Sequence, residues 1–405
     1  MLLNFTVLTS NILNVFEKTG KIIITCSNRL SGYIKSEVEA LGYVPTRVFK
    51  TGVELQGKLQ DCIKLNLRLR CASQVLFSIS EFTAHNADDV YKHATDMPWE
   101  DILLLDGYFS ITSNVSNETI TNNLFANVKL KDAIADRFRT VLNQRPNSGA
   151  DHAAAVVHLY WKDDLAEIFL DTSGETLSKH GYRKIPGKAP MLESLAAATI
   201  MAGQWDGNSN FINPMCGSGT LAIEAALQLC NKKPGLLRSN YAFMHLKNYN
   251  EQHYLQEYAL LEAAVVTPQV HIKVIASDIS EDAIMISKVN AEIAGVDEYI
   301  QFICCDFEDT PVPENESGAV YFNPEYGDRL GEEAELTLTY KRIGDFLKKK
   351  CKGYHGYIFT GNLELAKKIG LKPKRRIEFY TSKIDCRLLE YELYAGSKIA
   401  VDNTG

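Results

Sequence analysis

The residues best suited to chemistry lie in one short segment, Asn323-Pro324-Glu325-Tyr326, which follows a predicted strand. Asn323 offers a side-chain oxygen, Pro324 a backbone carbonyl and Tyr326 a flat ring on which a base can stack. An exocyclic amine is a poor nucleophile because its lone pair is delocalised into the ring. Two acceptors that hold its hydrogens keep the nitrogen facing an incoming methyl group and stabilise the positive charge that develops on it. The segment therefore predicts methyl transfer to a base amino group, although a simple turn has similar residues.

A second candidate site is the segment Asn213-Pro214-Met215-Cys216-Gly217-Ser218-Gly219-Thr220, between a predicted strand and a predicted helix. Glycines at such a turn let the backbone pass close to a ligand and bend sharply. Two glycines alone are weak evidence, because an ordinary tight turn has the same requirement. The longer pattern of nicotinamide-dependent dehydrogenases is absent, since Ala222 stands where its third glycine belongs.

Two acidic residues close further predicted strands, and each can bind part of a nucleoside. Asp278 is placed to accept both hydrogen bonds of a ribose diol. Its alternative role is a helix N-cap, which Ser280 would fill equally well. Asp306 is placed to accept from an adenine amino group while Phe307 packs on the ring. Each acid alone is only a strand-end residue, so the order of all the motifs together carries the prediction.

These motifs need a sheet that brings several strand ends together, and the sequence from Ala189 onward repeats strand-then-helix units. Strands are expected at 211–214, 270–277, 299–305, 319–323 and 356–360, and helices at 192–203, 221–230, 281–294 and 335–350. Such alternation indicates an open, mostly parallel sheet covered on both faces, whose ligands bind at the carboxyl ends of the strands. All of the motifs fall at those ends.

The N-terminal half predicts smaller α+β units. Strands are expected at 21–26 and 109–115, helices at 31–41, 88–94 and 128–142, a helix and then a strand within 61–79, and a hairpin of 152–161 with 165–170. The segment 171–190 is rich in glycine and proline and is the best linker candidate.

Composition indicates an ordinary folded chain of two or three domains, because 405 residues are too many for one compact core. The hydrophobic fraction of 45% argues against a largely disordered chain. No run reaches the roughly 18 to 20 apolar residues of a membrane helix, and the first residues lack the features of a signal peptide. Nine scattered cysteines, without a C-x-x-C pair, predict reduced thiols in a cytoplasmic protein and no bound metal.

A net charge of −7 counts against nucleic-acid binding, because phosphate contacts require Lys and Arg. The distribution matters more than the sum, and basic residues gather in three places. These are Lys129 with Lys131, the segment Lys179-His180-Gly181-Tyr182-Arg183-Lys184 with Lys188, and Lys372 to Arg376 with Lys383 and Arg387. They predict a local basic face on an acidic protein, although each run alone is also typical of a solvated surface.

Taken in order, the motifs resemble those of class I methyltransferases that use S-adenosylmethionine. The fuller resemblance is to the THUMP-domain guanine-N2 methyltransferases of bacterial 23S rRNA, in the N-terminal half of the K/L type. It is carried by Asp171 to Leu177, Lys179 to Arg183, Ala189-Pro190, Leu195 to Ala198, Lys129 to Ile134, Arg145 to Asn147, Pro234 to Leu236 and Ile384 to Arg387. It spans nearly all of residues 21–393 and leaves residues 1–20 as an irregular leader.

The resemblance implies a Rossmann-like methyltransferase domain preceded by an α+β ferredoxin-like and THUMP module that binds structured RNA. We place the ferredoxin-like piece at 21–65, the THUMP domain at 66–175, a linker at 176–190, the catalytic domain at 191–395 and a tail at 396–405. The resemblance also implies S-adenosylmethionine as methyl donor, N2-methylguanosine as product and large-subunit ribosomal RNA as partner. It indicates no oligomeric state.

Roles of individual residues follow from the resemblance by position. Met215, Gly217 and Gly219 border the methionine part of the donor, with Asn213 and Cys216 in the same loop, while Asp278 holds the ribose and Asp306 and Phe307 the adenine. Glu193 and Ser194 match a Glu-Thr of the family and also approach the donor. The expected RNA contacts are Lys129, Lys131, Lys179 and Arg183, with Glu325 beside the base.

Two residues depart from the family pattern, and both touch the expected site. Asn213 replaces an aspartate, which removes a negative charge near the sulfonium and is expected to weaken donor binding. Glu325 replaces the second proline of Asn-Pro-Pro-Tyr, which frees the backbone of Pro324. A Glu325 carboxylate turned inward would accept from the two adjacent donors on the Watson-Crick edge of guanine and favour guanine over adenine. A side chain that faces solvent is the alternative.

Two other functions remain open at this point. The same Asn-Pro-x-Tyr chemistry serves adenine-N6 methylation of DNA or RNA, and only the N-terminal resemblance weighs against DNA. Asn213 and Glu325 also suit a catalytically inactive RNA-binding assembly factor. The identity of the methylated nucleoside and a measurement of donor binding separate these functions.

Overall fold

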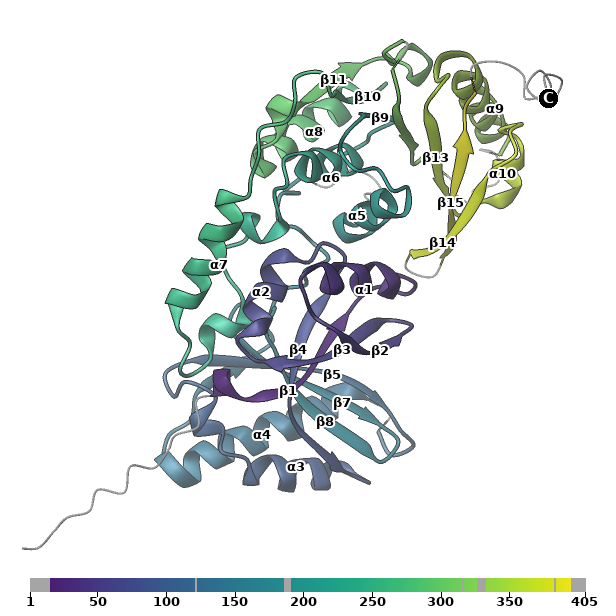
Figure 1. Ribbon diagram of the computed structural model, residues 1–405. Helices are drawn as coiled ribbons and strands as arrows, with labels where there is room; N and C mark the ends of the chain where they lie inside the picture. Colours follow the sequence, from purple (N-terminus) through teal and green to yellow (C-terminus); the bar gives the residue numbers. More distant parts are fainter. Residues whose placement is uncertain are drawn as a thin grey trace, which may run out of the picture.

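The computed structural model describes residues 15–120, 122–185, 191–314, 316–325, 333–381 and 384–394. Among these residues the chain forms an eight-stranded sheet in its N-terminal half and a seven-stranded sheet in its C-terminal half. Figure 1 shows the two halves at opposite ends of an elongated molecule, with the N-terminal half in purple to blue. Some residues of the sequence motifs lie outside the described ranges: Lys188, Ala189, Pro190, Tyr326, Gly327 and Lys383.

The N-terminal sheet has the strand order β2-β3-β1-β4-β8-β7-β5-β6. Its strands are β1 Thr19–Thr25, β2 Pro45–Phe49, β3 Gly52–Lys58, β4 Gln74–Thr83, β5 Tyr108–Ser116, β6 Asn147–Gly149, β7 Ala155–Lys162 and β8 Leu165–Asp171. The helices are η1 Val15–Glu17, α1 Ser31–Ala40, α2 Asp61–Arg68, α3 Ala87–Asp96, η2 Trp99–Asp101 and α4 Asn123–Leu142. Because β4 pairs with β1 on one side and β8 on the other, the ferredoxin-like and THUMP parts share one continuous sheet.

Two of the expected boundaries do not match this half. A division between residues 65 and 66 falls inside α2, so it cannot separate two folded units. The expected leader is also wrong in its last residues, since Val15 and Phe16 are buried and β1 already begins at Thr19. The helices near 31–41, 88–94 and 128–142 and the hairpin of β7 with β8 are confirmed.

The C-terminal sheet has the order β11-β10-β9-β12-β13-β15-β14. Its strands are β9 Asn210–Pro214, β10 Val274–Asp278, β11 Ile300–Cys304, β12 Gly318–Phe322, β13 His355–Thr360, β14 Arg375–Thr381 and β15 Ile384–Glu392. The helices are α5 Glu193–Ala202, α6 Thr220–Leu229, η3 Pro234–Leu237, η4 Ala242–His245, α7 Glu251–Ala263, α8 Glu281–Ala294, η5 Asp297–Tyr299, η6 Phe307–Asp309, α9 Glu333–Lys350 and α10 Leu363–Lys367. None of the helices in the described ranges is long and apolar enough to cross a membrane.

This sheet confirms the expected α/β fold and fixes where a ligand can bind. Strands β9 to β13 are parallel, and only β15 and β14 at one edge run antiparallel. The chain builds outward from β9 through β10 to β11 and then returns to place β12 on the other side of β9. In open α/β sheets ligands bind in the crevice outside the carboxyl ends of the strands at such a reversal. The strand order therefore predicts a ligand crevice between the carboxyl ends of β9 and β12.

Strands β9 and β12 are buried along their whole length, because helices cover both faces of the sheet. On one face the rings of Phe211, Tyr321 and Tyr357 stack at 4.9 and 4.4 Å, and the Tyr321 hydroxyl donates to the Thr199 carbonyl of α5 at 3.1 Å. On the other face Phe322 packs against Phe346 of α9. The two layers hold the strand ends in fixed positions.

The segment expected to be a linker is, in its described part, a buried joint between the two halves. His180 Nδ1 lies 2.7 Å from Glu224 Oε1 on α6, and the Tyr182 hydroxyl donates to the same oxygen at 2.9 Å. His180 Nε2 lies 2.8 Å from the carbonyl oxygen of Arg70, which follows α2. His180, Tyr182 and Glu224 are all fully or almost fully buried. The linker prediction is therefore wrong for these residues.

Three further contacts hold the halves together at their edges. Arg29 donates to Asp385 Oδ1 at 2.5 Å, next to the β14–β15 hairpin, and the rings of Tyr33 and Phe379 stack at 5.8 Å. On the opposite side Arg68 of α2 donates to Glu257 of α7 at 2.8 Å, and Figure 1 shows α7 running alongside both halves. The N-terminal module is thus fixed against the catalytic domain rather than tethered to it.

Candidate active site

The loop after β9 opens the crevice at its first strand. Met215, Gly217 and Gly219 have positive φ values of 58°, 56° and 81°. A Cβ added to Gly219 would lie 3.0 Å from the Cβ of Ser287, so close packing on α8 requires glycine there. A Cβ added to Gly217 would meet nothing within 4 Å. Gly217 therefore faces open space, where a ligand can approach the backbone.

Side chains of α8 hold this loop from behind. Ser287 Oγ donates to the Gly217 carbonyl at 2.7 Å, and Asn290 Nδ2 donates to the Ser218 carbonyl at 3.2 Å. Cys216 lies against the same helix, with Sγ 3.7 Å from Ser287 Oγ. Burial raises the pKa of Cys216 to about 12, so its thiol is neutral at physiological pH. Cys216 supports the loop and is not a reactive thiol.

Asp278 connects the glycine loop to the end of β10. Its Oδ2 accepts from the Gly217 N–H at 2.9 Å, and its Oδ1 accepts from the Ser280 N–H at 3.0 Å. The N-cap of α8 is Ser280, whose Oγ accepts from the Ala283 N–H at 3.3 Å. The capping role is thus filled by Ser280. Each carboxylate oxygen of Asp278 keeps a second lone pair with which to accept from a ribose hydroxyl.

Ile279 is a candidate contact that the sequence did not single out. It follows Asp278 directly, and 73% of its surface is exposed, which is unusual for a large apolar side chain beside a polar strand end. Its carbonyl accepts from the Cys304 thiol at 3.6 Å, so it lies toward the neighbouring strand β11. An isoleucine directly after a strand-end acid was the only available signal.

Asp306 keeps its expected place after β11, but Phe307 does not. The Phe307 ring is 6% exposed and meets Phe322 and Phe346 edge to face at 5.9 and 6.3 Å. The guanidinium of Arg342 covers it at 4.8 Å. The expectation that this ring packs on adenine is therefore wrong, because the ring is buried in the core beneath Arg342.

Asp306 is held in its ionised form. Its Oδ1 accepts from the Glu308 N–H at 2.9 Å and from Arg342 Nη2 at 2.8 Å. Partial burial raises the pKa of Asp306. The hydrogen bonds from the Glu308 N–H and Arg342 outweigh burial and leave the pKa below its ordinary value. A carboxylate with one free oxygen is therefore available at this strand end.

Asn213 and Asn323 lie at the adjoining carboxyl ends of the neighbouring strands β9 and β12. Strands β9 and β12 pair in parallel, with Ile212 opposite Val320, so the glycine loop and Asn323 emerge side by side. Asn213 is 1% exposed, and its Nδ2 donates to the Tyr321 carbonyl at 2.9 Å. The Oδ1 atoms of Asn213 and Asn323 are buried and have no hydrogen-bond partner in the described structure. Buried acceptors without partners are costly, so a ligand that donates to these two oxygens would gain binding energy here.

The remaining residues of this motif are placed in part. Pro324 is buried, whereas Glu325 is exposed. The Glu325 carbonyl accepts from the Tyr340 hydroxyl of α9 at 3.4 Å. The exposed Glu325 side chain is free to reach a base in the crevice or to stay in solvent. Tyr326 lies outside the described residues.

We predict that Asn213→Asp destabilises the chain without improving its activity. A carboxylate cannot donate to the Tyr321 carbonyl, and the loss of this buried hydrogen bond is expected to cost about 1 to 3 kcal/mol. Chemical denaturation measures the change, and Asn123→Asp, an exposed position at the start of α4, is the matched control. Higher activity of Asn213→Asp would instead identify Asn213 as a lesion in a decaying site.

The expected RNA contacts do not meet in one place. Lys129 and Lys131 lie on α4, where Lys129 pairs with Asp88 at 2.7 Å and Lys131 with Asp132 at 3.5 Å. Lys179 is exposed near the joint between the halves.

The structure contradicts two expectations for residues near α5. Arg183 pairs with Glu193 and donates to the Met191 carbonyl, and only 8% of its side chain is exposed. Its guanidinium is therefore not available to RNA. Glu193 is engaged by this pair, and burial raises its pKa, so it is not open to a donor molecule. Ser194 is buried beside it, with an unpartnered Oγ.

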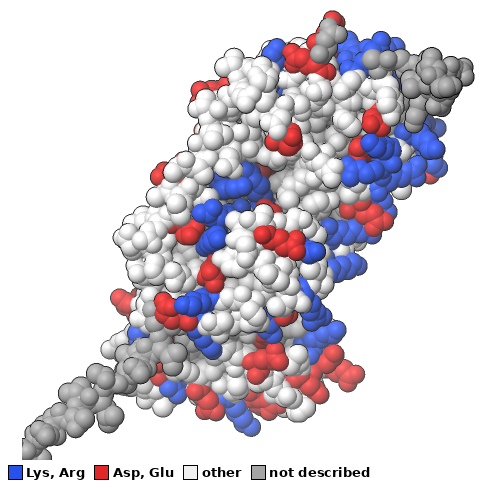
Figure 2. All heavy atoms as spheres, viewed as in Figure 1, with Lys and Arg blue, Asp and Glu red and all other residues white. Residues whose placement is uncertain are grey.

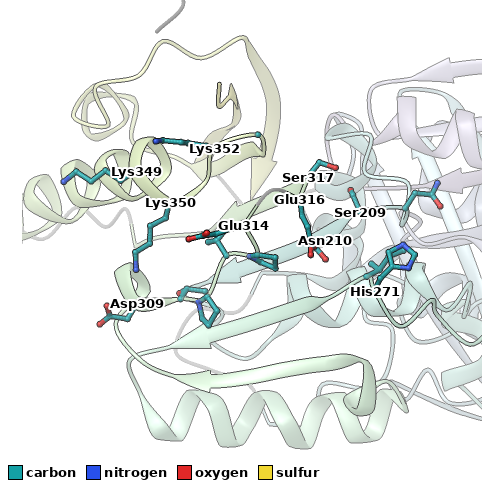
Figure 3. Close-up of a pocket in the computed structure, with 17 residues that line it drawn as sticks. Ser209, Asn210, His271, Asp309, Glu314, Glu316, Ser317, Lys349, Lys350 and Lys352 are labelled. Atoms are coloured by element: carbon teal, nitrogen blue, oxygen red, sulfur yellow. The ribbon is translucent and has the colours of Figure 1, made fainter. Parts of the chain in front are cut away.

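A groove of about 1170 Å3 lies at the other edge of the sheet, and Figure 3 shows its lining. It is bordered by Asn210, the first residue of β9, and by Ser317, just before β12, with lysines from the end of α9 on the opposite wall. The Asn210 amide already donates to Glu316 and to the Tyr354 hydroxyl. Because this groove is at the amino ends of the strands, it is separate from the candidate active site.

A parallel sheet whose reversal point combines a glycine loop, strand-end acids and an Asn-Pro motif defines a class of enzyme, the class I methyltransferases, which take their methyl group from S-adenosylmethionine. The chain belongs to the family of RMKL-like methyltransferase domains, which matches residues 180–390. Residues 21–76 match the RlmL ferredoxin-like domain and residues 84–171 the THUMP domain. The suspected family and the expected α/β class are confirmed.

Named relatives agree with this family. The "Ribosomal RNA large subunit methyltransferase K/L" of Syntrophotalea carbinolica is 33% identical over 384 residues, which covers 92% of this chain and 53% of that protein. The chain therefore spans about half the length of the curated relatives it matches. A "predicted N6-adenine-specific DNA methylase" from Listeria monocytogenes, a solved structure, is 28% identical with a TM-score of 0.83, covering 93% of this chain and 97% of that one. SMU.472, crystallised with S-adenosylhomocysteine, shares the fold at 23% identity, with a TM-score of 0.83 and coverage of 94% and 100%.

Proposed function

We propose that this chain methylates the exocyclic N2 of a guanine in large-subunit (23S) ribosomal RNA, with S-adenosylmethionine as donor. The observation that carries the proposal is the pair of unpartnered oxygens, on Asn213 and Asn323, at the adjoining ends of β9 and β12. The names of the curated relatives and the THUMP match support RNA as the substrate. The action of this enzyme would take place in the cytoplasm, where ribosomal RNA is modified in bacteria.

The residues present fit the donor. Open space beside Gly217 leaves room for the methionine part, the Asp278 carboxylate can accept from the ribose hydroxyls, and the free oxygen of Asp306 can accept from the adenine amino group. Exposed Ile279 offers an apolar surface to the adenine ring. When bound, S-adenosylmethionine supplies a methyl group already activated by its sulfonium.

The acceptor side is built by Asn323 and Pro324. The Asn323 Oδ1 and the Pro324 carbonyl can each accept one hydrogen of the guanine amino group, which aims the nitrogen at the glycine loop on the adjacent strand. These acceptors also stabilise the positive charge that develops on the nitrogen as the new bond forms. The base amine is itself the nucleophile, so no protein side chain forms a covalent bond.

The charge distribution is compatible with RNA on part of the surface. Figure 2 shows Lys and Arg side chains gathered over the region of α10 and β14, although the net charge of the chain is −7. Lys372 and Arg376 belong to this region, and Lys374 pairs there with Glu392 at 3.3 Å. A local basic surface provides the salt-dependent part of RNA binding.

The test uses purified chain, labelled S-adenosylmethionine and unmodified 23S rRNA. We expect label in the RNA, N2-methylguanosine as the labelled nucleoside in mass spectrometry, and one mapped position. N6-methyladenosine, or label only in duplex DNA, would favour the adenine-N6 alternative, which is supported by the name of the Listeria relative. A chain that binds the RNA but not S-adenosylhomocysteine would support the inactive assembly factor.

Glu325 gives a prediction about base choice. If its carboxylate accepts from N1–H and N2–H of guanine, Glu325→Gln should lower kcat/KM for guanine about 10- to 100-fold, the usual worth of a hydrogen bond to a charged group. Single-turnover methylation of matched guanine- and adenine-containing RNAs measures the change. Glu335→Gln, an exposed position on α9, is the control. Unchanged rate and selectivity in Glu325→Gln would place the side chain in solvent.

A further inference from the structure

Arg342 makes an unusual set of contacts beside the expected adenine site. Its Nη2 donates to Asp306 Oδ1 at 2.8 Å and to Glu308 Oε2 at 2.7 Å, and its Nε donates to Glu308 Oε2 at 3.1 Å. The guanidinium also lies over the Phe307 ring at 4.8 Å. Two carboxylates and one ring thus fix the guanidinium plane, which a lone surface ion pair would not do.

Both groups that donate a hydrogen bond to Asp306 reach the same carboxylate oxygen. The Glu308 N–H and Arg342 Nη2 both end on Oδ1, and no hydrogen bond from the described residues reaches Oδ2. The Asp306 side chain is 29% exposed, so Oδ2 has access to a ligand. A carboxylate pinned through one oxygen presents the other in a fixed direction.

We propose that Arg342 is a positioning residue of the donor site: it orients Asp306 so that Oδ2 accepts from the adenine amino group. The assignment rests on the proposed function, because it assumes that the adenosine of the donor lies at the end of β11. It goes beyond that function in naming a residue on α9 that determines how strongly the site selects an amino-bearing purine.

Helix α9 also contacts the Asn-Pro-Glu motif. Tyr340, two residues before Arg342, bonds Thr360 Oγ1 at 2.8 Å and donates to the Glu325 carbonyl at 3.4 Å. The same helix therefore contacts Asp306, at the proposed site of the methyl donor, through Arg342, and it contacts the Asn-Pro-Glu motif through Tyr340. Arg342 holds α9 against Asp306.

The test compares binding of S-adenosylhomocysteine and of S-inosylhomocysteine, in which a carbonyl oxygen replaces the adenine amino group. The wild-type chain should prefer S-adenosylhomocysteine about 10- to 100-fold, because the carbonyl cannot donate to Asp306. Arg342→Met should reduce this preference to a few-fold, since Asp306 is then free to turn. Lys341→Met, an exposed neighbour on the same helix, removes a charge without touching Asp306 and should keep the wild-type preference.

A double-mutant cycle separates orientation from general damage. In an Asp306→Ala background the preference should already be lost, and Arg342→Met should then change the ratio of the two dissociation constants no further. Arg342→Lys retains the charge without the planar fork and should give an intermediate ratio. Arg342→Lys also provides the test of orientation if Arg342→Met does not fold.

Calorimetric titration of the full chain distinguishes failure of the proposed donor site from failure of the role proposed for Arg342. If the wild-type chain binds neither compound, the proposed donor site fails and the inference falls with it. If the wild-type chain prefers S-adenosylhomocysteine and Arg342→Met keeps the same preference, the inference alone is overturned.

Discussion

Asn323→Ala is expected to lower kcat by about 100- to 1000-fold, the typical cost of removing one preorganised group that stabilises charge in the transition state. The Asn323 Oδ1 is buried and has no hydrogen-bond partner among the described residues, so we expect it to hold an amine hydrogen. Gly217 and Asp278, the residues proposed to bind the methyl donor, lie after β9 and at the end of β10, and their hydrogen bond joins them to each other rather than to Asn323. Affinity for S-adenosylhomocysteine should therefore remain close to that of the wild type, and calorimetry with single-turnover kinetics measures both quantities.

The control for this prediction is Asn323→Asp, which has the same shape and keeps an acceptor oxygen. It should retain a larger share of the rate than Asn323→Ala, because only alanine removes the acceptor. Joint loss of donor binding and activity in Asn323→Ala would mean that Asn323 is structural. Full activity of the alanine variant would remove the Asn-Pro motif from the mechanism.

The parts of the site that could be predicted are those that are local in the sequence. Each strand end is followed directly by its polar residue, as with Asp278 after β10 and Asn323 after β12, so a strand pattern locates the residue. A parallel sheet then brings these ends to one edge without further information. This is why the donor loop and the Asn-Pro motif could be expected side by side.

Contacts between residues far apart in the sequence could not be predicted in this way. The basic run around Arg183 suggested RNA binding, but Glu193, on the next helix, neutralises Arg183 in the core. Arg387 likewise pairs with Asp385, which Arg29 also contacts from the N-terminal half. Arg342 is separated from Asp306 by η6, strand β12 and the first half of α9, and no local pattern connects them. Runs of one charge do not reveal which partners the fold supplies.

Some elements were missed because their side chains do not follow a simple period. Strand β2 has no buried residue, so it lacks the alternation of apolar and polar residues that marks a half-buried strand. Helix α7 has a single buried side chain, Leu261, and no apolar stripe. Strand β14 of the β14–β15 hairpin begins with Arg375 and Arg376 and has Glu378 shortly after, so charged residues make up much of its first half. Each of these elements is held by neighbouring parts of the fold rather than by its own pattern.

Glu224→Ala is expected to destabilise the chain by about 3 to 5 kcal/mol, the usual cost of removing one partner of a buried ion pair. Glu224 is fully buried and faces His180 at 2.7 Å and Arg70 Nη1 at 3.6 Å. Both His180 nitrogens face oxygen acceptors, the Glu224 carboxylate and the Arg70 carbonyl, and these contacts favour the doubly protonated ring. Without Glu224 the His180 ring loses the carboxylate that it contacts most closely, and Arg70 loses an ion-pair partner in the buried joint.

The pH dependence gives this prediction a second readout. Burial lowers the pKa of His180, but Glu224, together with the Arg70 carbonyl and Glu193, outweighs burial and raises the pKa above its ordinary value. A raised pKa means that the stabilisation is complete below about pH 6.5 and is lost as the pH rises through the pKa of the folded state. The stability gap between wild type and Glu224→Gln, which keeps the volume but not the charge, should therefore narrow as the pH rises.

Urea denaturation of wild type, Glu224→Ala, Glu224→Gln and the exposed control Glu262→Ala measures the effect. The glutamine variant also keeps the test open if the alanine variant does not fold. Because Arg70 belongs to the N-terminal module and Glu224 to the catalytic domain, the loss should first uncouple the two halves. Equal stability of Glu224→Ala and Glu262→Ala would show that the buried joint does not hold the RNA-binding module against the active site.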